Sequence, residues 1–149
     1  MEVFHEPVTY SEAESKCRSL GGILAAPSTP VLQQEMLRLI NQLGGPLGYG
    51  YWIWLKAPET GVKNFVWSTG EALDGWVAWG PDQPNNWKGK NQDCVVMKMR
   101  EGERDKDGWN DNRCEEQRNY VCQLSDLKGW WKSLNIFLNC QLMRTSNQK

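Results

Sequence analysis

The hydrophobic pattern of the first part of the chain predicts a short strand followed by two amphipathic helices. Residues 2–10 contain β-branched and aromatic side chains and are predicted as a strand. The segment Ser11–Glu14 has the spacing of a capping box, so we expect a helix from there to Gly21. A second helix is predicted from Thr29 onward, because a proline follows this cap and apolar residues recur at helical spacing. These residues are Leu32, Met36, Leu39, Ile40 and Leu43.

Beyond the second predicted helix, short apolar runs alternate with turn residues. Strands are predicted at 51–55, 65–67, 94–99 and 120–123. Residues 68–90 are rich in Gly, Pro, Asn, Asp and Trp and predict a long irregular loop, which in a compact domain is usually functional. Residues 100–112 are predicted as a charged loop. Two helices followed by short strands around a long loop indicate an α+β fold.

Length and charge narrow the classes of function. The chain has 149 residues, which suits one domain plus a tail. Its 17 Lys and Arg nearly balance 18 Asp and Glu, so no nucleic-acid partner is expected. The uncharged runs are too short for a transmembrane segment, and the first residues lack the pattern of a signal peptide. With His5 as the single histidine and no nucleotide-binding loop, we expect that the protein is not an enzyme.

The cysteines favour a disulfide framework over a metal site. The five lie at 17, 94, 114, 122 and 140, and no CxxC motif occurs. Buried free thiols in a reducing compartment are the alternative. The spacing does not select one pairing among the many that five cysteines allow.

Several stretches, in this order and spacing, resemble the C-type lectin-like domain family. They are Thr9–Cys17, Leu20–Ala25, Trp52–Leu55, Gln83–Asn85, Gln92–Cys94, Gly108–Asp111, Cys114 and Tyr120–Cys122. The resemblance covers about residues 3–124 and implies a C-type lectin fold, with two helices, two small antiparallel sheets and a long functional loop. It also implies the disulfides Cys17–Cys122 and Cys94–Cys114, with Cys140 unpaired. We therefore expect a lectin-like domain over residues 1–124.

The resemblance further implies a calcium cofactor, held by oxygen ligands that also contact sugar hydroxyls. Carried over position by position, the ligands are Gln83, Asn85, Gln92, Asn110 and Asp111, and the bond before Pro84 is expected to be cis. Members of the family that bind mannose or galactose carry three carboxylates among these positions, whereas this chain keeps Asp111 alone. Because ligand charge sets calcium affinity, the site is expected to be weakened.

Sugar preference is expected to lean toward galactose. Gln83-Pro-Asn85 matches neither the Glu-Pro-Asn of mannose binders nor the Gln-Pro-Asp of galactose binders. Trp87 lies two residues later, where galactose binders carry a tryptophan on which the sugar stacks, and it joins the predicted sugar-binding set. The alternative is that Trp87 only covers the loop.

Residues 125–149 are predicted as a C-terminal amphipathic extension outside the lectin domain. This helix could dock on the domain, mediate self-association or lie on a membrane surface, unless the segment is a non-native extension. As a whole, the sequence predicts a secreted protein or the ectodomain of a larger one. It would be a calcium-dependent, galactose-leaning module that binds glycans on glycoproteins or cell surfaces, as in innate immunity. The alternative is a calcium-independent domain that binds a protein or another non-sugar ligand.

Overall fold

The computed structural model describes residues 1–45, 50–61, 64–73, 75–99 and 107–125. The elements are β1 (Glu2–Val8), α1 (Tyr10–Ser19), β2 (Gly22–Leu24), α2 (Pro30–Gln42), β3 (Tyr51–Lys56), β4 (Val66–Trp67), the 3-10 turn η1 (Trp87–Gly89), β5 (Cys94–Lys98), β6 (Gly108–Asn112) and β7 (Arg118–Leu124). The predicted helix of the C-terminal extension and Cys140 fall within residues 126–149, outside the described residues. None of the described helices is long and apolar enough to cross a membrane.

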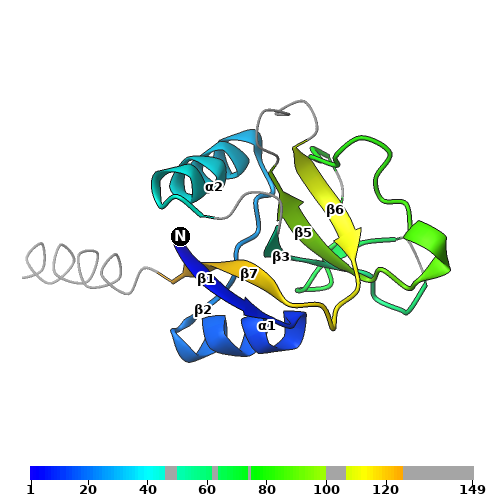
Figure 1. The fold of residues 1–149 in the computed structure, drawn as a ribbon, viewed down its shortest axis with the longest axis horizontal. Coiled ribbons are helices and arrows are strands. Elements are labelled where there is room, and N and C mark those ends of the chain that lie inside the picture. Colours follow the sequence, from blue (N-terminus) through cyan, green and yellow to red (C-terminus); the bar gives the residue numbers. More distant parts are fainter. Residues whose placement is uncertain (46–49, 62–63, 74, 100–106, 126–149) are drawn as a thin grey trace, which may run out of the picture.

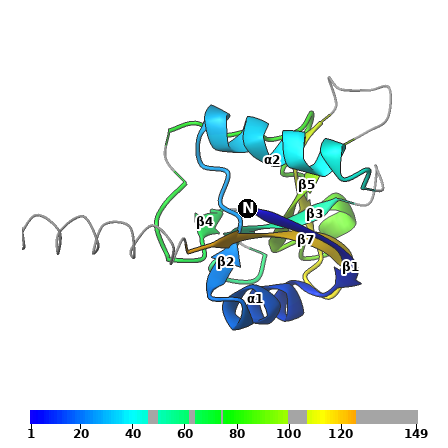
Figure 2. The same ribbon diagram turned by 90° about the vertical axis from the view of Figure 1, so that its left-hand side faces the viewer.

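The strands form one mixed sheet in the order β1-β7-β3-β5-β6, with β2 added to β7 and β4 to β3. All pairings are antiparallel except that of β3 with β7, where Tyr51 lies beside Asn119 and Trp52 beside Tyr120. The sheet therefore consists of two antiparallel groups joined by a short parallel contact. In Figures 1 and 2, α1 and α2 lie on opposite sides of β1 and β7. In Figure 1, the green loop after β4 lies on the far side of β6 from the helices. The α+β prediction is confirmed.

The first helix begins earlier than its predicted capping box. Its N-cap is Thr9, whose side chain accepts from the Glu12 N–H, and the Glu12 carboxylate accepts from the Thr9 N–H at 2.8 Å. The prediction of Ser11–Glu14 as the box is therefore wrong. Both frames contain a hydroxyl residue followed three positions later by Glu, and burial distinguishes them. The helix starts two residues earlier than predicted, and its buried side chains are Tyr10, Ala13 and Cys17.

The second helix follows its predicted start. Thr29 is the N-cap and Pro30 is the first helical residue. Met36 and Ile40 from the predicted apolar stripe are fully buried. Leu43, which we placed in the same stripe, is 56% exposed because the helix ends one residue before it.

The charged-loop prediction for 100–112 is wrong at its end, where the chain forms β6. This strand pairs with β5, so that Trp109 lies opposite Met97 and Asp111 opposite Val95. Trp109 and Asp111 are buried, whereas Asn110 between them is partly exposed. Burial alternates as in any half-buried strand, but the polar residue types conceal this period in the sequence.

Two disulfides fasten the domain, and they are the pairs that the resemblance implies. Cys17–Cys122 joins α1 to β7 across 105 residues. Cys94–Cys114 joins the start of β5 to the turn after β6 across 20 residues. Closing long loops in the unfolded chain lowers its entropy, so the first bridge is the more stabilising of the two on the entropic model.

Trp109 is the centre of an aromatic cluster that joins β6 to the rest of the domain. The rings of three other tryptophans meet it edge-on, with centroids 5.7–5.8 Å away: Trp67, Trp76 and Trp79. The buried Gln33 of α2 accepts from the Trp109 indole N–H at 3.1 Å and donates to the Met97 sulfur at 2.9 Å. This amide therefore fixes α2 to the strand that carries the cluster.

Replacing Gln33 by alanine should lower the free energy of unfolding by about 1–3 kcal/mol, because the buried Trp109 N–H loses its acceptor. Urea unfolding with the disulfides intact measures the change. Gln34→Ala is the matched control, because Gln34 lies on the exposed side of the same helix and should change stability by less than about 0.5 kcal/mol. Equal effects of the two substitutions would contradict the role given to Gln33.

Candidate ligand-binding site

Backbone hydrogen bonds strap the long loop to β6. The Gly80 N–H donates to the Trp109 carbonyl at 2.9 Å, and the Trp109 N–H donates to the Ala78 carbonyl at 2.7 Å. The two segments approach so closely that Gly108, with φ at 150°, leaves no room for a side chain. A Cβ at this position would lie 2.5 Å from the Gly80 nitrogen. The loop is therefore fixed to β6 just before the predicted tripeptide.

Asp111 holds the tripeptide in place. The Gln83–Pro84 peptide bond is cis, as the resemblance implies. The Asn85 N–H donates to Asp111 Oδ1 at 3.0 Å, and the Asn86 N–H donates to Oδ2 at 2.6 Å. Asp111 is only 1% exposed. A buried carboxylate thus has both oxygens hydrogen-bonded to the backbone of the loop that carries Gln83 and Asn85.

Gln92 closes the next part of the loop. Its Oε1 accepts from the Trp87 N–H at 2.7 Å, and its own N–H donates to Asn86 Oδ1 at 3.0 Å. Asn86 has a φ of 44°, a left-handed conformation that asparagine tolerates better than most residues. Asn86 is not among the residues predicted from the sequence, although two adjacent asparagines in a turn-rich segment are a recognisable signal for a left-handed conformation.

The predicted ligand residues differ in their exposure and in their hydrogen bonds. Gln83 Oε1 is buried and has no hydrogen-bond partner among the described residues. Asn85 is exposed, and Asn110 precedes Asp111 on β6. Across the described part of the chain, no three His, Cys, Asp or Glu side chains gather as a metal-binding group. The set therefore offers four neutral amides and one carboxylate.

Asp93, which stood near the predicted ligands in the sequence, is engaged elsewhere. Its Oδ1 accepts from the Gly61 N–H at 2.9 Å, and its backbone carbonyl accepts from the Ala57 N–H at 2.7 Å. Asp93 thus fixes the turn after β3. This carboxylate is therefore hydrogen-bonded to a segment other than the loop of the predicted ligands.

Trp87 lies on the surface of the loop, and the ammonium groups of two lysines lie over its ring. Its side chain is 52% exposed. Lys88 Nζ lies 4.2 Å and Lys90 Nζ 5.0 Å from the centre of the ring. The described residues include no carboxylate in an ion pair with either lysine. Trp87 is among the residues predicted from the sequence, whereas the two lysines are not, because their only signal is their closeness to Trp87 along the chain.

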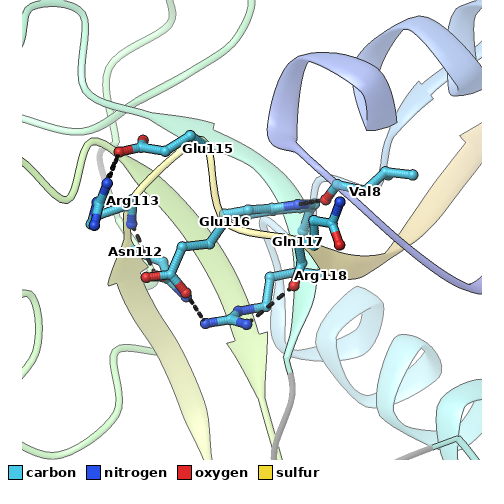
Figure 3. Close-up of polar contacts among 8 residues, drawn as sticks. Val8, Asn112, Arg113, Glu115, Glu116, Gln117 and Arg118 are labelled. Carbon is cyan, nitrogen blue, oxygen red and sulfur yellow. Dashed lines mark hydrogen bonds and ion pairs between the residues drawn. The ribbon is translucent and has the colours of Figure 1, made fainter.

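A mixed-charge cleft of about 660 Å³ adjoins this loop, beside the Cys94–Cys114 disulfide. Lys90, Asp93, Arg113 and Glu115 contribute its charged groups. Figure 3 shows Arg113 bonded to Glu115 across the turn after β6, with a second pair, Arg118–Glu116, below it. Hydrogen bonds from Arg113 hold the pKa of the Glu115 carboxyl below its usual range. The charges of the cleft therefore largely compensate each other.

Comparisons with known proteins agree with this geometry. The family described as Lectin C-type domain matches residues 6–124. Versican core protein from Rattus norvegicus is 31% identical over 116 residues, which cover 77% of this chain and 4% of versican. E-selectin from Canis lupus familiaris is 30% identical over 121 residues, covering 78% of this chain and 18% of E-selectin. The chain thus spans a small part of each relative's length.

Among solved structures, human lithostathine superimposes with a TM-score of 0.71 at 22% identity, covering 83% of this chain and 81% of the other. At this identity the likeness concerns the fold alone. The family match extends over most of the chain and includes the disulfides, the cis-proline tripeptide and β6. The chain belongs to the C-type lectin domain family.

Proposed function

We propose that this domain binds carbohydrate at the long loop. The proposed contact residues are Gln83, Asn85, Trp87, Gln92, Asn110 and Asp111. The observation that carries the proposal is the tripeptide fastened to buried Asp111, with Gln83 Oε1 left buried and without a hydrogen-bond partner in the described chain. Leaving a buried acceptor unpaired costs about 1–3 kcal/mol, so an ion or a ligand hydroxyl that completes Gln83 Oε1 would recover this cost.

The amide groups of this loop suit sugar hydroxyls. An Asn or Gln side chain offers two donors and one carbonyl acceptor, while a hydroxyl both donates and accepts. Asn85 is exposed, so its amide is free to approach a ligand. Asp111 acts mainly by positioning, since both its oxygens already accept from the loop backbone.

The residues fit calcium in donor type but are poor in charge. Gln83, Asn85, Gln92, Asn110 and Asp111 would hold the ion through oxygen atoms. When bound, calcium would provide a hard cation to which two neighbouring sugar hydroxyls can coordinate. With a single carboxylate, we propose a weak site in the millimolar range, about that of low-affinity extracellular modules.

For the sugar itself we propose galactose-type ligands on Trp87. The axial 4-hydroxyl of galactose leaves one face of the ring rich in C–H groups, which can lie flat on an indole. Trp87 is exposed enough to accept such a face. We also propose an extracellular setting, because two disulfides persist best under oxidising conditions. The partners would be glycans of glycoproteins or cell surfaces, bound several at a time for strength.

A second candidate is ligand binding that needs no calcium. The hydrogen bonds of Asp111 and Gln92 already hold the loop closed through the chain's own groups. A loop ordered in this way can present its surface to a protein or a sugar without an ion. This arrangement, together with the single carboxylate, favours the second candidate over a strongly calcium-dependent one.

A glycan array probed in calcium and again in EDTA separates the two candidates. We expect binding to terminal galactose or N-acetylgalactosamine that EDTA lowers, because the weak ion contributes to hydroxyl binding. Glycan binding unchanged by EDTA would select a calcium-independent lectin. A folded protein without any glycan signal would contradict the carbohydrate proposal and favour a protein ligand.

Gln92→Glu should tighten calcium binding about tenfold, since it adds a carboxylate at a ligand position. The new side chain keeps an acceptor for the Trp87 N–H, so the loop should hold its shape. Calorimetric titration with calcium measures the change. Gln117→Glu adds the same charge at an exposed position outside the predicted ligand set and should leave the affinity unchanged. Micromolar binding by the unmodified chain would show that the amides suffice as ligands.

Trp87→Ala should weaken galactose binding about tenfold, because stacking on an aromatic ring is worth about 1–2 kcal/mol. Binding of mannose, where measurable, should stay nearly constant, since its equatorial 4-hydroxyl interrupts the apolar face. Titration followed by NMR compares the two sugars. An equal loss for both would mean that Trp87 only shapes the loop, and tight mannose binding by the unmodified protein would reverse the preference.

A further inference from the structure

We infer that the sugar bound at Trp87 carries a negative charge, as a sulfate ester or a carboxylate. This inference rests on the proposed carbohydrate site and names its ligand class more closely. Its basis is the pair of ammonium groups over the exposed ring, Lys88 Nζ at 4.2 Å and Lys90 Nζ at 5.0 Å from the centroid.

A sugar and the two lysine ammonium groups compete for the face of the Trp87 ring, and the charge of the sugar decides the outcome. A cation over an indole is attracted by the ring's negative face, so a neutral sugar that stacks there must displace it. The displaced ammonium then returns to water and the attraction is lost. An anionic sugar instead offers the ammonium a new partner, and charge-assisted hydrogen bonds are stronger than neutral ones. The same lysines therefore oppose a neutral hexose and favour an anionic one.

The surrounding charges leave this preference in place. In the adjoining cleft, Arg113 is already bonded to Glu115, so this ion pair attracts an anion only weakly. The Asp93 carboxylate accepts from the Gly61 N–H, which offsets part of its repulsion toward an anion. Asp111 is buried under the loop. Lys88 and Lys90 are thus the positive groups that an anion would meet at the rim of the described site.

The backbone conformation of the loop explains why both lysines lie over the Trp87 ring. Asn86, Lys88 and Gly89 all have positive φ, at 44°, 55° and 64°. The chain curls tightly between Trp87 and Lys90, so that residues one and three positions beyond the tryptophan both reach its ring. A rigid aromatic ring and two cations are therefore presented together, as recognition of a charged sugar requires.

Titration with galactose, galactose 6-sulfate and galacturonic acid, each in calcium buffer, tests the inference. We expect at least one of the two anionic sugars to bind about fivefold or more tightly than galactose, as two exposed charge contacts allow. The gap should shrink when sodium chloride rises from about 50 mM to about 500 mM, because salt screens exposed charges. Comparison of the two anions tells whether sulfate or carboxylate is preferred.

Two charge-changing double variants make the test specific. Lys88→Gln with Lys90→Gln should abolish the preference and should tighten the binding of neutral galactose, because no ammonium then has to be displaced from the ring. Lys88→Arg with Lys90→Arg should retain it. The matched control, Lys16→Gln with Arg38→Gln, removes two exposed positive charges from α1 and α2 and should also retain it.

The outcomes separate this inference from the proposed function. Galactose binding with no gain for either anion overturns the anionic ligand but leaves the carbohydrate site intact. A gain that survives the Lys88 and Lys90 glutamine variant also overturns it, because other groups would then provide the attraction. Binding of none of the three sugars by the folded domain overturns both proposals together.

Discussion

The ligand loop depends on one strand, β6, whose alternate residues enter the interior. The rings of three other tryptophans surround Trp109, and Asp111, two residues on, is buried and hydrogen-bonded to the backbone of the loop that holds the cis-proline tripeptide. Because side chains on a strand alternate with a period of two, the packing of Trp109 dictates which way Asp111 points. The hydrophobic core thus fixes the position of the carboxylate that holds the loop. The geometry of the loop therefore depends on the burial of Trp109.

Much of this architecture follows from local pattern. Helix α2 begins where a cap and a proline predict it, and the strands at 51–55, 94–99 and 120–123 are present with small shifts of their ends. The disulfide pairs needed the family resemblance, because spacing alone leaves many pairings open. The capping box of α1 was misplaced because two overlapping frames satisfy the same local rule, and only tertiary burial selects between them.

The rest of the candidate site could not be read from the sequence. Strand β6 is rich in Asn and Asp, so its period is visible only once the burial of Trp109 and Asp111 is known. The bonds of Asn86 to Gln92 and of Asp93 to Gly61 depend on where a loop without regular structure folds back. Likewise, the position of Lys88 and Lys90 over Trp87 follows from left-handed backbone angles at Asn86, Lys88 and Gly89, and lysine gives no signal of such an angle.

The weak calcium site and the preference for anionic sugars that we propose would have a common electrostatic origin. Compared with the pattern of family members that bind sugar through three carboxylates, this loop has amides at Gln83 and Gln92. Each missing charge lowers the attraction for a divalent cation, and it also removes repulsion toward an anionic ligand. The remaining carboxylate, Asp111, is buried and bonded to two backbone N–H groups, so its field at the surface is partly cancelled. Because Lys88 and Lys90 are exposed on the same loop, the loss that we propose for calcium would be a gain for negatively charged sugars.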